Sequence, residues 1–182
     1  MQRWFVILLV LAAAPVHAST WLMQDGSTFT FTASFESESL EGRFTRFDVA
    51  IDLASQESAH GSLQVTVNLA GADMGDPDMN EAIAAAEWFD VTGFPEAIFE
   101  SNDIVALAPG SFVAHGELLL KGKRRDVDVP FAWSESGNTA TMRGELTLER
   151  LDYDIGTGEW ASGEQIGNDV ILRFDLRFER AD

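Results

Sequence analysis

Apolar and polar residues alternate with period two through most of this chain, and this alternation constrains its fold more than any other feature. The clearest case runs from Val170 to Arg180, where every second residue is apolar. Successive side chains of an extended strand point to opposite faces, so such a segment has one buried and one solvated face. The apolar members are Val170, Leu172, Phe174, Leu176 and Phe178. Period two therefore favours a fold built from half-buried strands.

About eight segments carry this pattern, and most of them are joined by short turns. The turns at Lys121–Arg124 and Gly137–Asn138 have the composition of hairpin connections. Phe44 falls out of phase with its neighbours, which predicts a bulge or twist between Gly42 and Arg46. The expected strands are 27–36, 40–53, 62–69, a segment that begins at Glu96, 111–121, 125–133, 141–151 and 170–180. The predicted fold class is all-β, an antiparallel barrel or sandwich of about eight strands.

One helical segment interrupts the strands, from Met79 to Trp88. It is rich in Ala and Glu, and Asp78 as N-cap with Glu81 three residues later forms a capping box. The aromatic segment Glu87–Ser101 follows and returns the chain from helix to sheet. Because the helix is inserted between strands, we expect it to cover one mouth of a barrel.

The first eighteen residues have the composition of a cleavable secretory signal peptide. Arg3 precedes an apolar run that is shorter than the roughly 20 residues of a membrane span, and a small residue, Ala18, ends the segment. We expect cleavage after Ala18, so that residues 1–18 are removed and 19–182 form one exported domain. A retained membrane anchor is the less favoured alternative. The chain has no Cys, so this domain must be stabilised by core burial without disulfides.

The charge of the chain excludes some partners. Its formal net charge is −18 at pH 7, and such a field repels phosphate backbones, so nucleic acid is a poor partner. Acidic chains with few aromatic residues are often disordered, but thirteen Phe and five Trp argue for a globular domain here.

The interior of a barrel of about eight strands either is filled by side chains or holds one small ligand. The inward faces carry many Phe rings together with small residues that leave space opposite them. These small residues are Ala33, Ala114, Gly116 and Gly144. This mixture favours a cavity, and the inserted helix is placed to gate it.

Several motifs, spread over the whole chain after residue 18, resemble the YceI-like family. The most specific is the string that contains Phe89-Asp90-Val91, Phe94-Pro95 and Phe99-Glu100-Ser101. The others are Gly42-Arg43-Phe44, Asp78, Gly116 to Gly122, Arg150 to Gly156 and Ile166 to Val170. The motifs occur in the order that they have in the family.

The resemblance implies a lipocalin-like, extended antiparallel barrel in the periplasm, whose apolar tunnel binds a long-chain isoprenoid lipid. The stretch Gly156–Trp160 is similar to a branch of the family associated with cytochrome b561-type membrane proteins. A prenylated quinone such as ubiquinone is then a candidate ligand alongside a polyprenyl lipid. Such barrels also form dimers, so a homodimer is a further expectation.

A polyprenyl chain needs a dry, apolar bore rather than charged partners. The large aromatic residues on inward faces are therefore the candidates for ligand binding, although any one of them is about as well explained as ordinary core. They are Phe31, Phe35, Phe47, Phe89, Phe94, Phe99, Phe112, Phe131, Trp133 and Phe174. The favoured function is that of a periplasmic carrier that has no cofactor and no catalytic residues. The alternatives are an accessory subunit of a membrane redox protein and, less favoured, a lipid-modifying enzyme.

Arg150 extends the inward face of its strand, where an unpaired charge would be costly. We expect a structural ion pair with Asp152, Asp154 or Asp169 near the barrel rim. The alternative is that Arg150 meets the polar headgroup of a ligand.

Nothing else in the sequence favours a metal or catalytic site. Without Cys or paired His, a transition-metal site is not expected. Asp76, Asp78, Asn80 and Glu87 have calcium-loop spacing, but Glu81 stands where that loop requires Gly. The basic cluster 121–125 is interpreted as a solvated hairpin turn, with docking to an acidic membrane partner or a lipid headgroup as the alternative.

Overall fold

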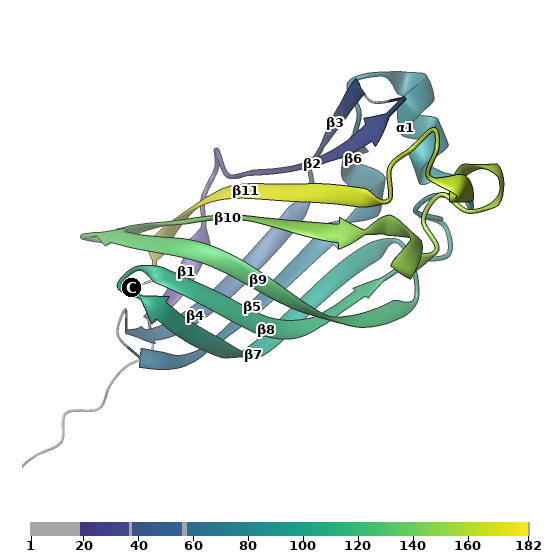
Figure 1. The fold of residues 1–182 in the computed structure, drawn as a ribbon. Coiled ribbons are helices and arrows are strands. Elements are labelled where there is room, and N and C mark those ends of the chain that lie inside the picture. The colour runs from purple at the N-terminus through teal and green to yellow at the C-terminus, as the bar shows by residue number, and fades with distance from the viewer. Residues whose placement is uncertain (1–18, 37, 56–57, 182) are drawn as a thin grey trace, which may run out of the picture.

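Antiparallel strands wound into a closed ring make up most of the structure, a computed structural model that describes residues 19–36, 38–55 and 58–181 (Figure 1). Within these residues, eight strands form the ring, and pairing of the first with the last closes it. In ring order they are β1 (Ser19–Met23), β4 (Phe47–Ser55), β5 (Ser58–Asn68), β7 (Glu96–Ala108), β8 (Ser111–Leu120), β9 (Lys123–Ser136), β10 (Thr139–Glu149) and β11 (Asp169–Arg180). The prediction of an antiparallel barrel of about eight strands is confirmed.

Two strands share one edge of β11. β1 pairs with residues 178–180 of β11, whereas β2 (Thr28–Phe35) pairs with residues 171–175. Between them the chain turns at Gly26, whose φ of +83° is accessible to a glycine without strain. On its other edge, β1 pairs with β4. Residues 19–21 of β1 lie opposite residues 51–53 of β4, and this pairing completes the ring.

The other end of the barrel is completed by a short branch of the sheet. β2 pairs with β3 (Glu38–Phe44), and β3 pairs with β6 (Ala72–Asp73), which follows the 3-10 turn η1 (Leu69–Gly71). The side chains of Arg43 and Asp73 reinforce this last pairing with an ion pair of 2.7 Å. The two ends of the barrel therefore differ, and we call them the closed end, at β1, and the open end, at β6.

The predicted bulge between Gly42 and Arg46 is wrong. β3 ends at Phe44 and β4 begins at Phe47, and the two residues between them bond to the η1 region (Thr45 N–H to Gly71 O, 2.9 Å). Phe44 is out of phase with the β4 residues because it belongs to a different strand in another part of the sheet.

One α-helix, α1 (Pro77–Ala84), lies at the open end beside the tips of β2 and β3 (Figure 1). The same end carries the 3-10 turns η2 (Arg150–Tyr153) and η3 (Gly158–Ser162), between β10 and β11. Ile83 of α1 reaches the interior of the barrel. The predicted helix at a barrel mouth is confirmed. Within the described residues, no helix has the length and apolar character that a membrane span requires.

The predicted start and end of the helix are wrong. Asp76, not Asp78, is the N-cap, and its carboxylate accepts hydrogen bonds from the N–H groups of Asp78 (2.9 Å) and Met79 (3.1 Å). Pro77 then occupies the first helical position, where its missing N–H is no loss. The helix ends at Ala84 because the following residues fold back into turns, with Phe89 N–H bonded to Ile83 O at 3.0 Å.

Large rings fill the closed end. Phe112 and Phe131 stack with their centroids 5.4 Å apart, and Trp21 meets Trp133 edge-on at the same separation. Phe178, which packs on Trp133, is 1% exposed and Phe112 is fully buried. This part of the interior is a packed core, which we call the closed-end core.

Phe112→Ala should lower the free energy of unfolding by about 3–5 kcal/mol, because it removes a fully buried ring from a packed core. Denaturant titration followed by circular dichroism measures the change. Leu107→Ala, at a side chain that is 64% exposed, is the matched control and should change stability by less than about 0.5 kcal/mol. Equal losses in the two variants would contradict this description of the core.

Candidate ligand cavity

A cavity of about 190 Å³ occupies the barrel between the closed-end core and the loops of the open end. Its wall is formed by side chains from β2, β3, β4, β5, β7, β8, β9, β10 and β11, with contributions from α1 and η2. Almost all of these side chains are aliphatic or aromatic. Among the described residues that line it, three carry polar side-chain atoms, namely Trp88, Arg150 and Tyr153.

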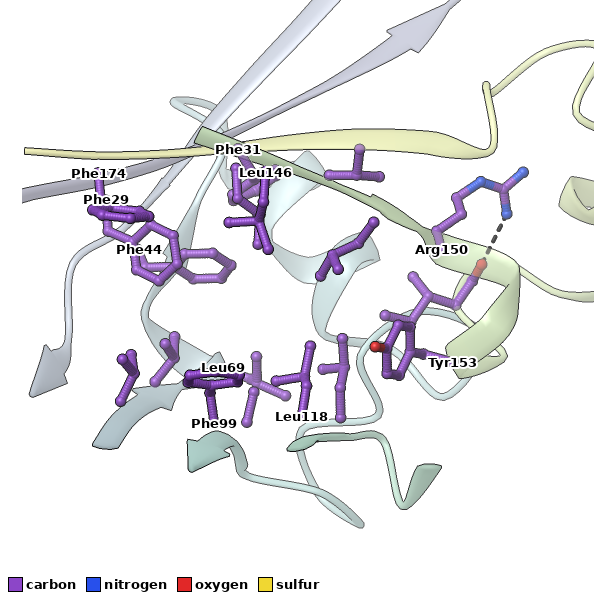
Figure 2. A pocket seen from close by; sticks show the side chains of 18 of the residues that line it. Phe29, Phe31, Phe44, Leu69, Phe99, Leu118, Leu146, Arg150, Tyr153 and Phe174 are labelled. Atoms are coloured by element: carbon purple, nitrogen blue, oxygen red, sulfur yellow. Dashed lines mark hydrogen bonds between the residues drawn. The ribbon is translucent and has the colours of Figure 1, made fainter. Parts of the chain in front are cut away.

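Phenylalanine rings form one side of the cavity. Phe44 lies at the centre of this group, with its ring centroid 4.9 Å from that of Phe31 and 5.2 Å from that of Phe29. Phe99 and Leu118 lie on the opposite side of the space (Figure 2). The interior is therefore an apolar slot between two sheet faces.

Glycines on neighbouring strands decide how the rings lie. A Cβ atom added at Gly42 would collide with the ring of Phe31, and one at Gly144 would collide with the ring of Phe174. Each ring thus lies over a glycine of the adjacent strand, in register pairs that bring the two residues together. Lying over glycines, the rings stay close to the wall.

Of the four small residues expected to leave space opposite the rings, Ala33 lines the cavity. Ala114 is fully buried in the core, and rings lie over both Gly116 and Gly144, so the expectation is wrong for these three.

Arg150 is 3% exposed, and its guanidinium points away from the cavity (Figure 2). All five of its N–H groups donate to backbone carbonyl oxygens, at distances of 2.6–2.9 Å. The acceptors are the carbonyls of Ile155, Gly156, Trp160, Ile166 and Gly167. The ring of Trp88 packs 5.9 Å from the guanidinium carbon. Burial lowers the pKa of Arg150, but an arginine remains charged at any physiological pH.

The predicted ion pair of Arg150 is wrong. None of the three expected carboxylates is within salt-bridge distance of it in the described residues, and Asp154 instead pairs with Lys123 at 2.8 Å. The loop that follows η2 folds back over Arg150, which brings its carbonyl groups to the guanidinium. These carbonyls supply the negative ends of dipoles in place of a carboxylate. Arg150 therefore fastens the loop between β10 and β11 to the barrel.

The basic turn between β8 and β9 also connects loops of the open end. Lys121 donates from Nζ to the carbonyl oxygens of Ala86 and Asp154, both at 2.8 Å. Arg124 pairs with Glu117. Gly122, Arg124 and Arg125 are exposed, so the prediction of a solvated hairpin turn is confirmed, with Lys121 tied to the neighbouring loops.

Tyr153 lies in η2 with its hydroxyl directed into the cavity (Figure 2). The residue is 2% exposed, and its hydroxyl has no hydrogen-bond partner in the described part of the chain. Burial, and to a smaller degree the nearby Asp152 carboxylate, raises the pKa of the Tyr153 phenol. It is therefore a protonated hydrogen-bond donor inside an apolar space.

Four of the ten rings predicted to bind a ligand line this cavity: Phe31, Phe89, Phe99 and Phe174. Three others, Phe112, Phe131 and Trp133, lie in the closed-end core. The remaining three are not part of the wall either. Phe47 is partly buried, between the core residues of the barrel and the group of rings around Phe31 and Phe44. Phe35 and Phe94 are 40% and 37% exposed. Alternation specifies the face of the strand on which a residue lies. It does not specify how far along the barrel axis the residue lies, and this position decides whether the residue belongs to the packed core or to the cavity wall.

The sequence interpretation missed three notable wall residues. Phe29 has the same phase as Phe31, so the alternation alone could have identified it. Phe44 falls out of phase with its neighbours in the sequence, so the alternation does not indicate that it faces the interior. Tyr153 lies in a 3-10 turn, where no periodic pattern indicates its direction.

The acidic residues with calcium-loop spacing are used differently. Asp76 caps α1, and the side chain of Asn80 bonds to Asp73 and to the N–H of Met74. Searched over 19–36, 38–55 and 58–181, the structure has no group of three or more His, Cys, Asp or Glu side chains placed to share a metal ion. The expected signal peptide and its cleavage site after Ala18 lie outside the described residues.

A closed antiparallel ring with an apolar cavity under a capping helix defines a lipocalin-like β-barrel. The chain belongs to the YceI-like domain family, whose sequence model matches residues 21–178. The resemblance that the motifs indicated is thus confirmed.

Solved structures show the same barrel. BcnA of Burkholderia cenocepacia is 30% identical, with a TM-score of 0.80 over 83% of this chain and 95% of that one. A polyisoprenoid binding domain from Saccharophagus degradans, implicated in plant cell wall breakdown, is 16% identical, with a TM-score of 0.73 over 91% of this chain and 100% of that one.

Among curated sequences, a UPF0312 protein of Vibrio cholerae is 24% identical over 122 residues. The match covers 64% of this chain and 65% of that protein, which is slightly less than two thirds of its length.

Arg150→Lys should lower the free energy of unfolding by at least about 2 kcal/mol, because an ammonium group cannot reach five carbonyls and leaves several of them unpaired. Denaturant titration measures the loss, and hydrogen exchange of residues 155–167 should accelerate. Arg143→Lys is the control, since Arg143 is 64% exposed in its pair with Asp175 and should lose less than about 0.5 kcal/mol. Unchanged stability of Arg150→Lys would contradict the fastening role.

Proposed function

We propose that this protein binds a long-chain lipid in its barrel cavity and carries it through the periplasm as a non-catalytic carrier. The observation that carries the proposal is the composition of the cavity wall, which is apolar except for Trp88, Arg150 and Tyr153. A wall of this kind offers a hydrocarbon chain contact along its length. Among the described residues that line the cavity, none carries a carboxylate or an imidazole that could act as a general base, so we propose binding rather than conversion of the lipid.

The energetics of burial support a hydrocarbon ligand. Each buried methylene contributes about 0.8 kcal/mol, so a tail with roughly ten buried carbons contributes on the order of 8 kcal/mol before the cost of ordering it. Because association itself costs about 4–15 kcal/mol, tight binding requires a tail with more buried carbons than this. The proposed binding energy therefore comes from the length of the hydrocarbon chain rather than from charged contacts.

The size of the cavity limits how much of a long lipid can enter it without movement of the wall. Its volume of about 190 Å³ lies below the roughly 300–1,000 Å³ of most small-molecule sites. A long lipid can enter fully only if wall side chains move apart. Met74 and Met142 of the wall are suited to this, because the unbranched, flexible side chain of methionine repacks readily.

The proposal also covers the class of lipid that is bound and the compartment in which it is carried. The relative from Saccharophagus degradans is described as a polyisoprenoid binding domain, which supports a polyprenyl lipid or a prenylated quinone as cargo. The signal-like segment 1–18 supports export to the periplasm. We also propose that the cargo is transferred to a cytochrome b561-type membrane protein and that the protein is a homodimer. These two points are supported by the family resemblance alone.

The test is mass spectrometry of an organic extract from protein purified out of the periplasm without detergent. We expect a prenyl lipid or quinone at close to one molecule per barrel. An extract without lipid, together with no binding when such lipids are added, would overturn the proposal.

Val65→Phe should reduce the amount of retained lipid at least tenfold, because Val65 lines the cavity and a ring at this position fills the bore. Leu107→Phe adds the same ring at an exposed position and should retain as much lipid as the native protein. Equal retention by both variants would show that the lipid lies outside this cavity.

A further inference from the structure

Tyr153 is a buried residue whose hydroxyl donates a hydrogen bond to none of the described residues. Tyr153 is 2% exposed, and within the described residues its hydroxyl makes no hydrogen bond. It points into the cavity near the open end (Figure 2). Leaving such a group unpaired in an apolar space is unfavourable, so an acceptor atom on a bound molecule would gain the hydrogen bond that the protein itself does not supply.

Most cations around the open end are committed to other contacts. Each of the five N–H groups of Arg150 already donates to a backbone carbonyl, and its guanidinium faces away from the cavity. Lys121 donates to two carbonyl oxygens, and Lys123 pairs with the Asp154 carboxylate. Arg125 lies close enough to Tyr153 to influence it electrostatically, but it is exposed near the start of β9. A phosphate entering the cavity would have to break these contacts or reach out to Arg125 to be neutralised.

The charge around the open end also disfavours an anion. Glu87, Asp90 and Asp154 lie close enough to Lys121 to influence it electrostatically, and Asp152 lies close to Tyr153. The whole chain carries a formal net charge of −18. A negatively charged headgroup would meet this repulsion, and the exposed Arg125 would offset only part of it.

We infer that Tyr153 donates its hydroxyl hydrogen bond to an uncharged acceptor oxygen on the lipid, and that the cavity thereby selects neutral oxygenated lipids over phosphate-bearing ones. This inference rests on the proposed function and names its ligand class. A quinone carbonyl, an ester or amide carbonyl and a prenol hydroxyl all present the required oxygen. Polyprenyl phosphates and diphosphates are excluded from the class.

Trp88 is the other wall residue with a donor that no described contact uses, but it is only half-buried, so its indole N–H is less dependent on a ligand. Its ring also packs on Arg150 and lies 6.0 Å from the ring of Trp160. Trp88 therefore belongs to the cavity wall itself, and a control variant has to lie outside that wall.

The experiment compares three probes of equal chain length by isothermal titration calorimetry: a benzoquinone with a ten-carbon tail, the plain hydrocarbon and the alkyl phosphate. The native protein should bind the quinone more tightly than either of the others. Tyr153→Phe should weaken quinone binding about two- to twelvefold, the range expected for one neutral hydrogen bond, and leave hydrocarbon binding unchanged. Leu107→Phe, at a 64% exposed position outside the cavity wall, should keep the quinone preference.

The stability of the empty protein separates a binding role from a structural one. Tyr153→Phe removes an unpaired hydroxyl and keeps the ring, so its denaturation midpoint without ligand should equal or exceed that of the native protein. A lower midpoint, a quinone preference that survives in Tyr153→Phe, loss of that preference in Leu107→Phe, or alkyl phosphate binding as tight as that of the quinone would each overturn the inference. Failure of both quinone and hydrocarbon to bind would overturn the proposed function together with it.

Discussion

Five backbone carbonyls converge on the buried guanidinium of Arg150, and the open end of the barrel depends on this interaction. A buried cation is tolerated only when its charge is met by hydrogen bonds or an opposite charge. Since the acceptors lie between residues 155 and 167, the loop after η2 cannot leave the barrel without exposing that unmet charge. Lys121 ties the turn between β8 and β9 to the same region through two further carbonyls. The loops thus form a frame that presents Tyr153 to the cavity.

The unequal ends of the barrel decide where a ligand can be bound. At the closed end, β1 joins β4 to β11 and stacked rings fill the interior. At the open end, the sheet continues through β2, β3 and β6, and the rings of Phe31 and Phe174 lie over glycines instead of across the bore. The interior therefore changes along one axis from packed core to apolar cavity to a polar atom at Tyr153. A lipid with an uncharged oxygen near one end of a hydrocarbon chain has the same order of chemical groups.

The chemistry of this site differs from that of a catalytic pocket in a specific way. Its charged side chain, Arg150, is saturated by main-chain acceptors, so it stabilises the fold and has no N–H left for a ligand. Its hydroxyl is held protonated by burial, which raises the pKa of Tyr153. In the proposed complex, the apolar wall would set the affinity, and one hydrogen bond from Tyr153 would add little affinity but discriminate between headgroups.

The sequence by itself determined the strand content, the antiparallel class and the family, because period-two alternation and local motifs are properties of neighbouring residues. It placed Phe31, Phe99 and Phe174 on inward faces correctly, and it placed Phe112 and Trp133 inward as well. Only the tertiary structure separated these two groups, since height along the barrel axis follows from strand register between segments far apart in the chain. The partners of Arg150 could not be predicted for a related reason: they are main-chain carbonyls, which every residue carries and no side-chain pattern marks. The direction of Tyr153 depends on that same loop fold.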